Sequence, residues 1–380
     1  MSPRRQSALR WSAVVLVLGS YIAGAAWFAG HTPIYHLYKS TGGARVSYEK
    51  ARVLAVKAEE LEREKSSGLD TGYQDLEVRI LTGEKKGAEL DIRNFLNYTT
   101  NIRLRPGSAI IVHMDVADAE HYTVSVYSLD RGPALLALAV IFFAALCGIG
   151  GRRGARSVLG IAFTFASIAF LFIPLLYRGC SPTLSAVAVV AATVGVSLVL
   201  LGGIDAKTLS AVLGSYAGLA VSALAIVAFQ RLTLISGYTT AEADSLLAIG
   251  GQSGMKVGEL LFAAMLIASS GAIMDVAISV ASAVREVRAS NPGLTRTRLF
   301  ASGMNVGRDM MGTMANTLIL AFTGASLNTL ILIYSLEHSF YQILNSNTIV
   351  IEIVEALTGS LAVILTVPAV AIIAALLTRS

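Results

Sequence analysis

The sequence predicts a polytopic α-helical membrane protein with about eight transmembrane helices and a small all-β, OB-like barrel domain inserted after the first helix. Three observations lead to this fold class. Of the 380 residues, 54% are apolar and only 14% are charged, which is typical of a chain that places most of its surface in lipid. Apolar runs of membrane-spanning length recur along the chain, and only residues 31–130 lack one. That stretch instead alternates apolar and polar residues.

The first predicted element is an N-terminal transmembrane anchor within residues 1–30. A basic start, "MSPRRQSALR", precedes an apolar run over 11–29. This run is about as long as a bilayer-spanning helix, so we expect an uncleaved anchor. A cleaved signal peptide is the alternative, because "AGAA" offers small residues for cleavage.

Residues 31–130 are expected to form the β domain. Five stretches alternate as strands do: "ARVLAVKAEE", "QDLEVRIL", "GAELDIRN", "SAIIVHMD" and "HYTVSVYS". The segment "TGEKKG" between the second and third indicates a hairpin turn. Such a domain either binds a ligand or serves as a rigid cap or dimer surface, since a fold alone does not assign a role.

Residues 131–380 are expected to form a seven-helix transmembrane bundle. The predicted spans cover residues 133–149, 158–177, 183–201, 209–230, 257–284, 310–336 and 353–377. Most Lys and Arg residues of the short loops, among them Arg4, Arg152 and Arg288, fall on the side that carries both chain ends. By the positive-inside rule we therefore expect both termini in the cytoplasm and residues 31–130 outside it.

Polar residues recur at helical spacing in the last three predicted spans. Because lipid is an unfavourable surrounding for such faces, we expect the three to converge on one intramembrane site around Asp275 and Asn316. A carboxylate and a carboxamide there would bind a cation or relay a proton. The alternative is that the same residues only pack helices. The candidate transport or ion-binding residues are Asp275, Ser279, Asp309, Thr313, Asn316 and Glu355.

A long basic connection is expected between the sixth and seventh spans, over residues 285–310. The turn "NPG" lies within it, and residues 296–306 are expected to form a short surface helix. This loop would face lipid headgroups or dock a cytoplasmic partner protein such as an ATPase. Its basic residues are Arg285, Arg288, Arg296, Arg298 and Arg308.

Other classes of site have little support in the sequence. His113, Asp115 and His121 in "HMDVADAEH" are weak candidates for a metal site, and ordinary surface histidines are the alternative. No nucleophile elbow, P-loop, zincin helix or dinucleotide fingerprint is present, so we expect neither an enzyme nor a cofactor. No basic run interleaved with aromatic residues supports binding of nucleic acid.

Two stretches, "SSGAIMDVAISVASAVREV" and "FASGMNVGRDMMGTMANTLILAFTGASL", carry a family resemblance. With them, the chain resembles the YibE/F-like family of bacterial multi-pass membrane proteins. The order of one anchor, a strand-rich domain and a seven-span bundle also fits that family. The resemblance implies a protein of the bacterial cytoplasmic (inner) membrane. The motif positions with side-chain chemistry are Asp275, Asn305, Arg308, Asp309 and Asn316.

The function expected from these features is that of a permease or ion-coupled transporter for a small solute or cation. Asn305 joins the candidate site residues through the family motif. The alternative is a membrane subunit or assembly module, which docks a partner through the Arg-rich loop or the outer β domain. Both alternatives allow a homo-oligomer in the lipid bilayer.

Overall fold

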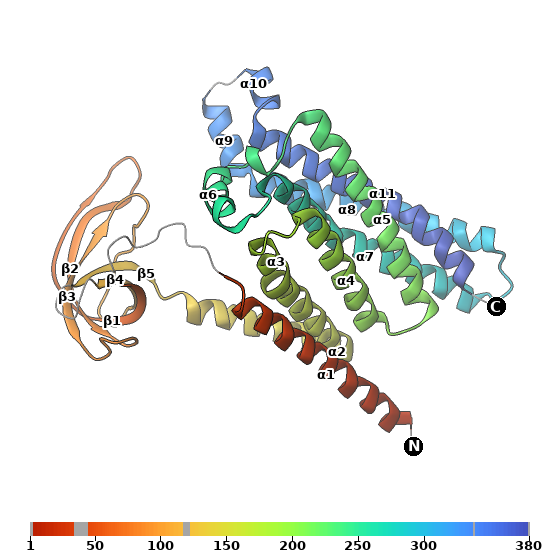
Figure 1. The fold of residues 1–380 in the computed structure, drawn as a ribbon, viewed down its shortest axis with the longest axis horizontal. Coiled ribbons are helices and arrows are strands. Elements are labelled where there is room, and N and C mark those ends of the chain that lie inside the picture. Colours follow the sequence, from red (N-terminus) through yellow and green to blue (C-terminus); the bar gives the residue numbers. More distant parts are fainter. Residues whose placement is uncertain (1–2, 34–44, 117–121, 337–338, 379–380) are drawn as a thin grey trace. The chain divides into compact units, whose positions relative to one another are not determined.

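A computed structural model describes residues 3–33, 45–116, 122–336 and 339–378 of the chain. The chain divides into two compact units (Figure 1). One unit is Tyr38–Ala145, and the other combines Met1–Leu37 with Leu146–Ser380.

The strand unit is a curled antiparallel half-barrel of five strands in the order β3-β2-β1-β4-β5. All five expected strands are present. β1 is longer than expected, because its first half pairs with β4 and its second half with β2. Bulges after Val53 and Val56 let the long strand curve between these two partners. The strands are β1 Arg45–Arg63, β2 Asp70–Ile80, β3 Glu89–Leu96, β4 Ala109–Val116 and β5 Tyr122–Leu129.

A buried amide holds the connection between β3 and β4 against the half-barrel core. The Gln74 side chain accepts a hydrogen bond from the Leu104 backbone N–H (2.9 Å) and donates one to its carbonyl oxygen (3.1 Å). Asn94 donates a further hydrogen bond to Gln74 (3.1 Å). Leu104 thereby fills the core beside Val78 and Ile110, and the buried amide has its hydrogen bonds satisfied.

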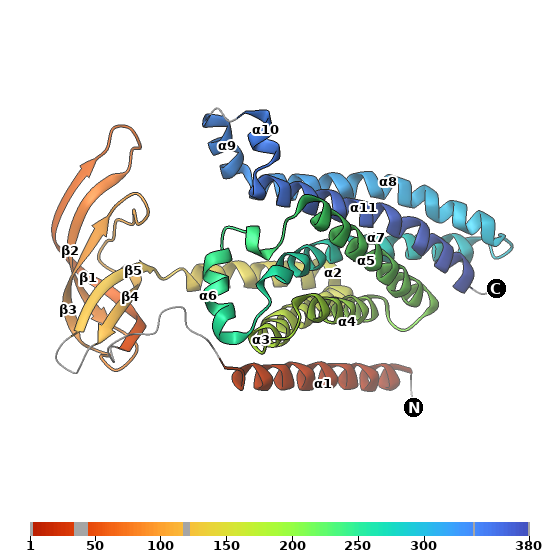
Figure 2. The same ribbon diagram turned by 45° about the horizontal axis from the view of Figure 1, so that its top comes forward.

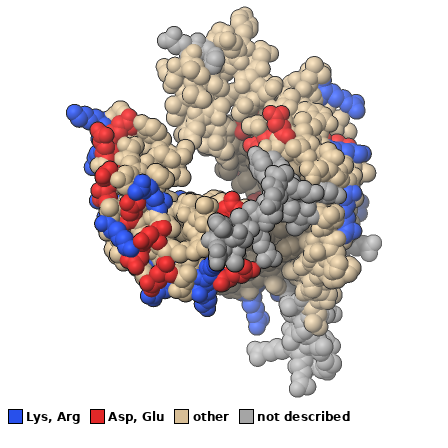
Figure 3. Space-filling view, turned by 60° about the vertical axis from the view of Figure 1, so that its left-hand side comes forward, with Lys and Arg blue, Asp and Glu red and all other residues tan. Residues whose placement is uncertain are grey.

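Figure 3 shows that charged side chains of both signs gather over the strands. Many of them are ion-paired between strands, as Arg93 of β3 is with Asp75 of the neighbouring β2 (2.7 Å) and Lys57 of β1 is with Asp91 of β3 (2.6 Å). Such pairs keep the outer face of the sheet soluble while contributing little stability each.

The second unit is helical. α7 and α11 occupy its centre, and α4, α5 and α8 pack around them (Figure 2). The helices of the chain are α1 Pro3–Gly30, α2 Gly132–Ser167, α3 Ile173–Tyr177, α4 Pro182–Gly202, α5 Ala206–Thr233, α6 Ala243–Ser253, α7 Leu260–Ser290, α8 Arg296–Ala325, α9 Leu327–Ser335, α10 Phe340–Leu344 and α11 Asn347–Leu377. A π-helical turn, Ile168–Phe172, joins α2 to α3.

Among the described residues, five helical stretches are long and apolar enough to cross a membrane. A sixth span results if α8 and α9, which are bent by 60° at their junction, are counted together. These lengths and compositions indicate a membrane protein, while the expected number of about eight spans remains a prediction. The stretches are Gly132–Tyr177, Pro182–Gly202, Ala206–Thr233, Val257–Ser290 and Asn347–Leu377.

Part of the difference between the expected number of spans and the number of long apolar helical stretches lies in Gly132–Tyr177. This stretch has 46 residues, and the sequence predicts two spans there. Gly151 in its middle has a non-helical backbone (φ 52°, ψ −130°), which glycine adopts far more readily than other residues. A Cβ built on Gly154 would lie 1.9 Å from the Leu146 carbonyl oxygen. In a straight helix these residues would be about 12 Å apart, so the chain turns sharply at Gly151.

Small residues allow the central helices to approach closely. Gly214 and Gly218 of α5 lie against Val370 and Thr366 of α11. Gly303 and Gly307 of α8 lie against the adjacent face of α11, at Ala371 and Val367. Such contacts are a main source of helix association in membranes. The fully buried apolar residues around them include Ile273, Val276, Val280, Val363 and Val367.

Candidate functional site

The polar stripe of α7 faces away from the centre of the bundle. Gly271 and Asp275 are exposed and Ser279 is half-buried, whereas Ile273 and Val280 on the opposite side are fully buried. The core-facing side is occupied because α4, α5, α8 and α11 all pack against α7. No side chain among the described residues donates a hydrogen bond to the Asp275 carboxylate or forms an ion pair with it.

The polar stripe of α8 also faces outward. Asn305, Asp309, Thr313 and Asn316 are exposed. The three stripes are expected to converge on one site around Asp275 and Asn316, and in the structure the α8 stripe faces away from α11. The reason is that α8 packs against α11 on the helix face that carries Gly303. The polar residues of α8 therefore lie on its opposite face.

The register of the α7–α8 hairpin brings some of the candidate residues to the same depth. Gly303 lies against Val284, and Ser269 and Leu318 each lie 3.6 Å from the Cβ position of Gly359. In this antiparallel register, Asp275 is level with Thr313, and Ser279 with Asp309. Asn316 lies about one helical turn further along α8 than the level of Asp275. We call the polar residues of the two stripes the polar face: Gly271, Asp275 and Ser279 on α7, and Asn305, Asp309, Gly312, Thr313 and Asn316 on α8. The register sets the depth of each residue along the bundle and not the distance between the two stripes.

Glu355 does not belong to this layer. It is half-buried on α11, one turn before Gly359, and Gly359 lies beside Ser269 and Leu318. The same register places Glu355 about 15 Å along the bundle axis from the level of Asp275.

A hydroxyl pair that the sequence did not single out joins α5 to α7. Ser222 and Ser269 are both buried, and their hydroxyl oxygens are 3.0 Å apart. This contact satisfies two polar groups in the bundle interior, which is the packing role of such residues. Periodicity placed Ser269 on α7 but could not indicate its partner, which is 47 residues away.

The basic residues expected in a long loop lie instead on two helices. α7 continues to Ser290 and α8 begins at Arg296, so only Asn291–Thr295 connects them. The separate surface helix over 296–306 is absent because these residues are the first turns of α8. Leu299 is buried there, in a cluster with Val284.

The five arginines have different surroundings. Arg285 forms an ion pair with Asp205, which precedes α5, and Arg288 donates a hydrogen bond to the Leu294 carbonyl oxygen (2.6 Å). Arg308 donates one to Asn305 (3.2 Å), one turn before it on α8. Arg296 and Arg298, at the start of α8, are exposed.

Asp205 caps α5 and anchors Arg285. Its carboxylate accepts a hydrogen bond from the Thr208 backbone N–H (2.8 Å). Burial raises the pKa of the Asp205 carboxyl, but the hydrogen bonds from Thr208 and Arg285 outweigh burial and hold this pKa below its ordinary value.

The weak metal candidates lie on β4 of the strand unit. His113 and Asp115 are two residues apart and share the outer face of the sheet, where the His113 ring is 5.2 Å from the Tyr48 ring. His121 lies outside the described residues. Within the described part of the chain, no group of three or more His, Cys, Asp or Glu residues is placed to hold a metal ion.

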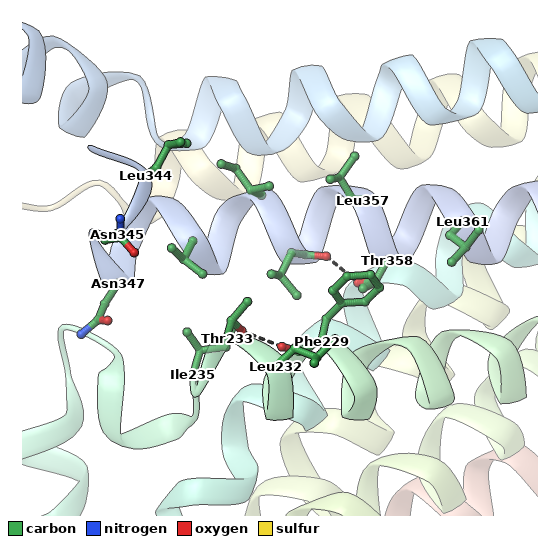
Figure 4. Close-up of a pocket in the computed structure, with 13 residues that line it drawn as sticks. Phe229, Leu232, Thr233, Ile235, Leu344, Asn345, Asn347, Leu357, Thr358 and Leu361 are labelled. Carbon is green, nitrogen blue, oxygen red and sulfur yellow. Dashed lines mark hydrogen bonds between the residues drawn. The ribbon is translucent and has the colours of Figure 1, made fainter. Parts of the chain in front are cut away.

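A cavity of about 740 Å³ lies between α5, α10 and α11 (Figure 4). Asn345 and Asn347 lie at one end of it and Leu361 at the other. Little in the sequence marks this site, because its walls combine residues more than 100 positions apart whose apolar side chains resemble any lipid-facing surface. The only sequence signal is the pair of asparagines just before a long apolar helix.

Comparison with known proteins adds one finding. No curated protein and no solved structure matches the chain. A family model described as "YibE/F-like protein" matches residues 138–380, which is more than half of the chain and includes α7, α8 and α11. Both stretches that carried the resemblance lie inside this match. The chain therefore belongs to the YibE/F-like protein family.

Proposed function

We propose that this protein is a permease or ion-coupled transporter whose ion path runs along the polar face of α7 and α8. The observation that carries the proposal is Asp275, which lies within a span and is exposed without a protein partner among the described residues. A carboxylate in the membrane requires water, a cation or a proton, because lipid solvates its charge poorly.

The depths of the other polar residues support this role. Thr313 on α8 is level with Asp275 and Asp309 is about one turn nearer the α7–α8 connection, so the two stripes offer oxygen atoms at successive depths of the membrane. Oxygen ligands suit Na⁺-like hard cations, and carboxylates also relay protons. Asp275 would take up the ion, and Asp309 and Asn305 would pass it toward the basic end of the helices.

The proposed topology has about eight spans, with both termini in the cytoplasm of a bacterium and residues 31–130 outside the inner membrane. Arg285, Arg288, Arg296 and Arg298 lie at one end of the helical unit. α1 begins and α11 ends at this same end (Figure 2). This clustering is what the positive-inside rule leads us to expect of a cytoplasmic side.

The outer domain is proposed to be OB-like. Its long first strand pairs with two different strands, and the sheet curls into part of a barrel.

The test is charge displacement in proteoliposomes adsorbed on a solid-supported membrane, after a jump in Na⁺ concentration or in pH. The wild-type chain is expected to give a transient current with one of these ions. Asp275→Asn, which keeps the size of the side chain, is expected to reduce it by about tenfold or more.

Asp244→Asn is the matched control, because Asp244 is an exposed carboxylate on α6, away from the polar face. This variant should give the wild-type current. A wild-type chain without current in either ion jump, or a full current in Asp275→Asn, contradicts the proposal.

A second candidate function is that of a membrane subunit that docks a cytoplasmic protein. It is favoured by the exposed Arg296 and Arg298, which project from the start of α8. Co-purification from native membranes in mild detergent separates the two candidates. A stoichiometric partner that is lost in the variant with Arg296→Ala and Arg298→Ala would favour the subunit.

A further inference from the structure

We infer that the cavity between α5 and α11 is a binding site for one acyl chain of a membrane phospholipid. The site lies at the ends of two spans, where α5 finishes at Thr233 and α11 starts at Asn347. Its volume of about 740 Å³ is within the range of sites that hold small organic ligands. This inference does not depend on the proposed transport function.

The walls of the cavity offer almost no hydrogen bonds to a ligand. Thr233 donates its hydroxyl hydrogen to the Phe229 carbonyl oxygen (2.6 Å), and Thr358 donates its own to the Val354 carbonyl oxygen (2.7 Å). Figure 4 shows both bonds. None of the described residues that line the cavity is charged. A sugar, an ion or a peptide would leave its polar groups unsatisfied there, whereas a hydrocarbon chain would not.

The polar groups are confined to one end. Asn345 donates a hydrogen bond to the Tyr341 carbonyl oxygen (2.8 Å), which leaves its own side-chain oxygen as an acceptor. Asn347 is exposed beside it, at the first turn of α11. The cavity is thus polar at the end of the span and apolar along its depth. A phospholipid has the same order of polarity.

The length of the cavity fits one lipid leaflet. Asn347 and Leu361 are 14 residues apart on α11, which corresponds to about 21 Å along a helix. Half of a bilayer, including its headgroup layer, measures about 20–22 Å. The asparagines would therefore lie among the headgroups, with Leu361 near the middle of the membrane.

The cavity is also accessible from the lipid. Leu232 on α5 is 76% exposed and Leu357 on α11 is 57% exposed, so the groove opens sideways along its length. A phospholipid can enter from the surrounding leaflet without crossing any polar barrier.

The experiment uses the full chain in nanodiscs of phosphatidylcholine. A minor fraction of this lipid carries a photoactivatable diazirine at the middle of one acyl chain. After illumination, the labelled residues are mapped by mass spectrometry. Labelling is expected to concentrate on Phe229, Leu232, Ile353, Leu357 and Leu361.

Leu361→Trp fills the deep end of the cavity and is expected to lower this labelling by about tenfold, equivalent to 1.4 kcal/mol. Leu232→Trp fills it from α5 and should act in the same way, which keeps the test valid if one variant fails to fold. Leu365→Trp is the matched control. It adds the same ring one turn along α11, at an exposed residue outside the cavity, and should label as the wild type does.

Two results would overturn the inference. One is labelling that spreads evenly over all lipid-facing helices, and the other is labelling of Leu361→Trp that is as strong as that of Leu365→Trp. Either result would mean that ordinary annular lipid surrounds the helices and the cavity holds no bound chain.

Discussion

Single glycines set how closely α5 and α8 approach α11. A Cβ built on Gly214 would lie 2.2 Å from a methyl group of Val370 and 3.0 Å from its Cα atom. The Cα atom cannot move without the helix, so a side chain at this position pushes the two helices apart. Two other glycines, Gly312 and Gly324 on α8, have no neighbour within 4 Å of this position among the described residues.

We expect Gly214→Ala to lower the free energy of unfolding by about 1–3 kcal/mol through overpacking. Gly312→Ala makes the same chemical change on the open side of α8 and should leave stability unchanged or slightly higher. Thermal unfolding of the two variants in one mild detergent checks this. Equal melting temperatures would show that the α5–α11 contact is looser than described.

Helical spacing identified which residues share a face, but not the direction in which that face points. Asp275 and Ser279, and likewise Asp309 and Thr313, do lie on common faces, as their spacing predicted. The orientation depends on which side of each helix packs against its neighbours. On α8, the side that carries Gly303 makes these contacts. These contacts involve residues far apart in the sequence, so no local pattern records them.

The α7–α8 connection shows a similar limit at the level of elements. The turn at "NPG" was recognised, since Asn291–Thr295 is where the helices separate. The following residues form the start of α8 rather than a surface helix, because Leu299 is buried in the cluster that also holds Val284 and Ala374. Charge density suggested a loop, but these tertiary contacts extend the helix beyond the apolar segment.

The α4–α5 connection is held to α7 by Asp205 and Arg285, and this contact predicts a pH dependence. The folded-state pKa of Asp205 is lowered, so its ionised form stabilises the protein above the unfolded pKa of about 3.9. That stabilisation is lost as the pH falls through the lowered folded-state pKa.

Asp205→Asn should therefore be less stable than the wild type near pH 7, by no more than about 1 kcal/mol for this partly exposed pair. The difference should shrink as the pH falls below about 4. Melting temperatures between neutral pH and pH 3 check this, with Asp244→Asn as the control. A difference that grows on acidification would contradict the assigned sign.

For the whole molecule, composition and apolar length were sufficient to predict a membrane protein with a separate strand domain, and the family match agrees with the resemblance. Span number was harder to predict. Gly151 shows why, since a sharp turn inside one helical stretch and two separate spans look alike in hydropathy. The α5–α11 cavity was beyond prediction, because concave and convex apolar surfaces have the same composition.

The central claim is that water lines the polar face of α7 and α8 within the membrane. Its most direct test is thiol accessibility in intact membranes, with native Cys147 and Cys180 replaced by Ser. Single cysteines at Gly271, Asp275 and Thr313 are expected to react with a membrane-impermeant maleimide. Cysteines at Leu224 and Leu365, both exposed apolar positions on α5 and α11, should stay unreactive. If the three polar-face cysteines are as inert as these controls, lipid or another protein chain covers the face and the proposed ion path is wrong.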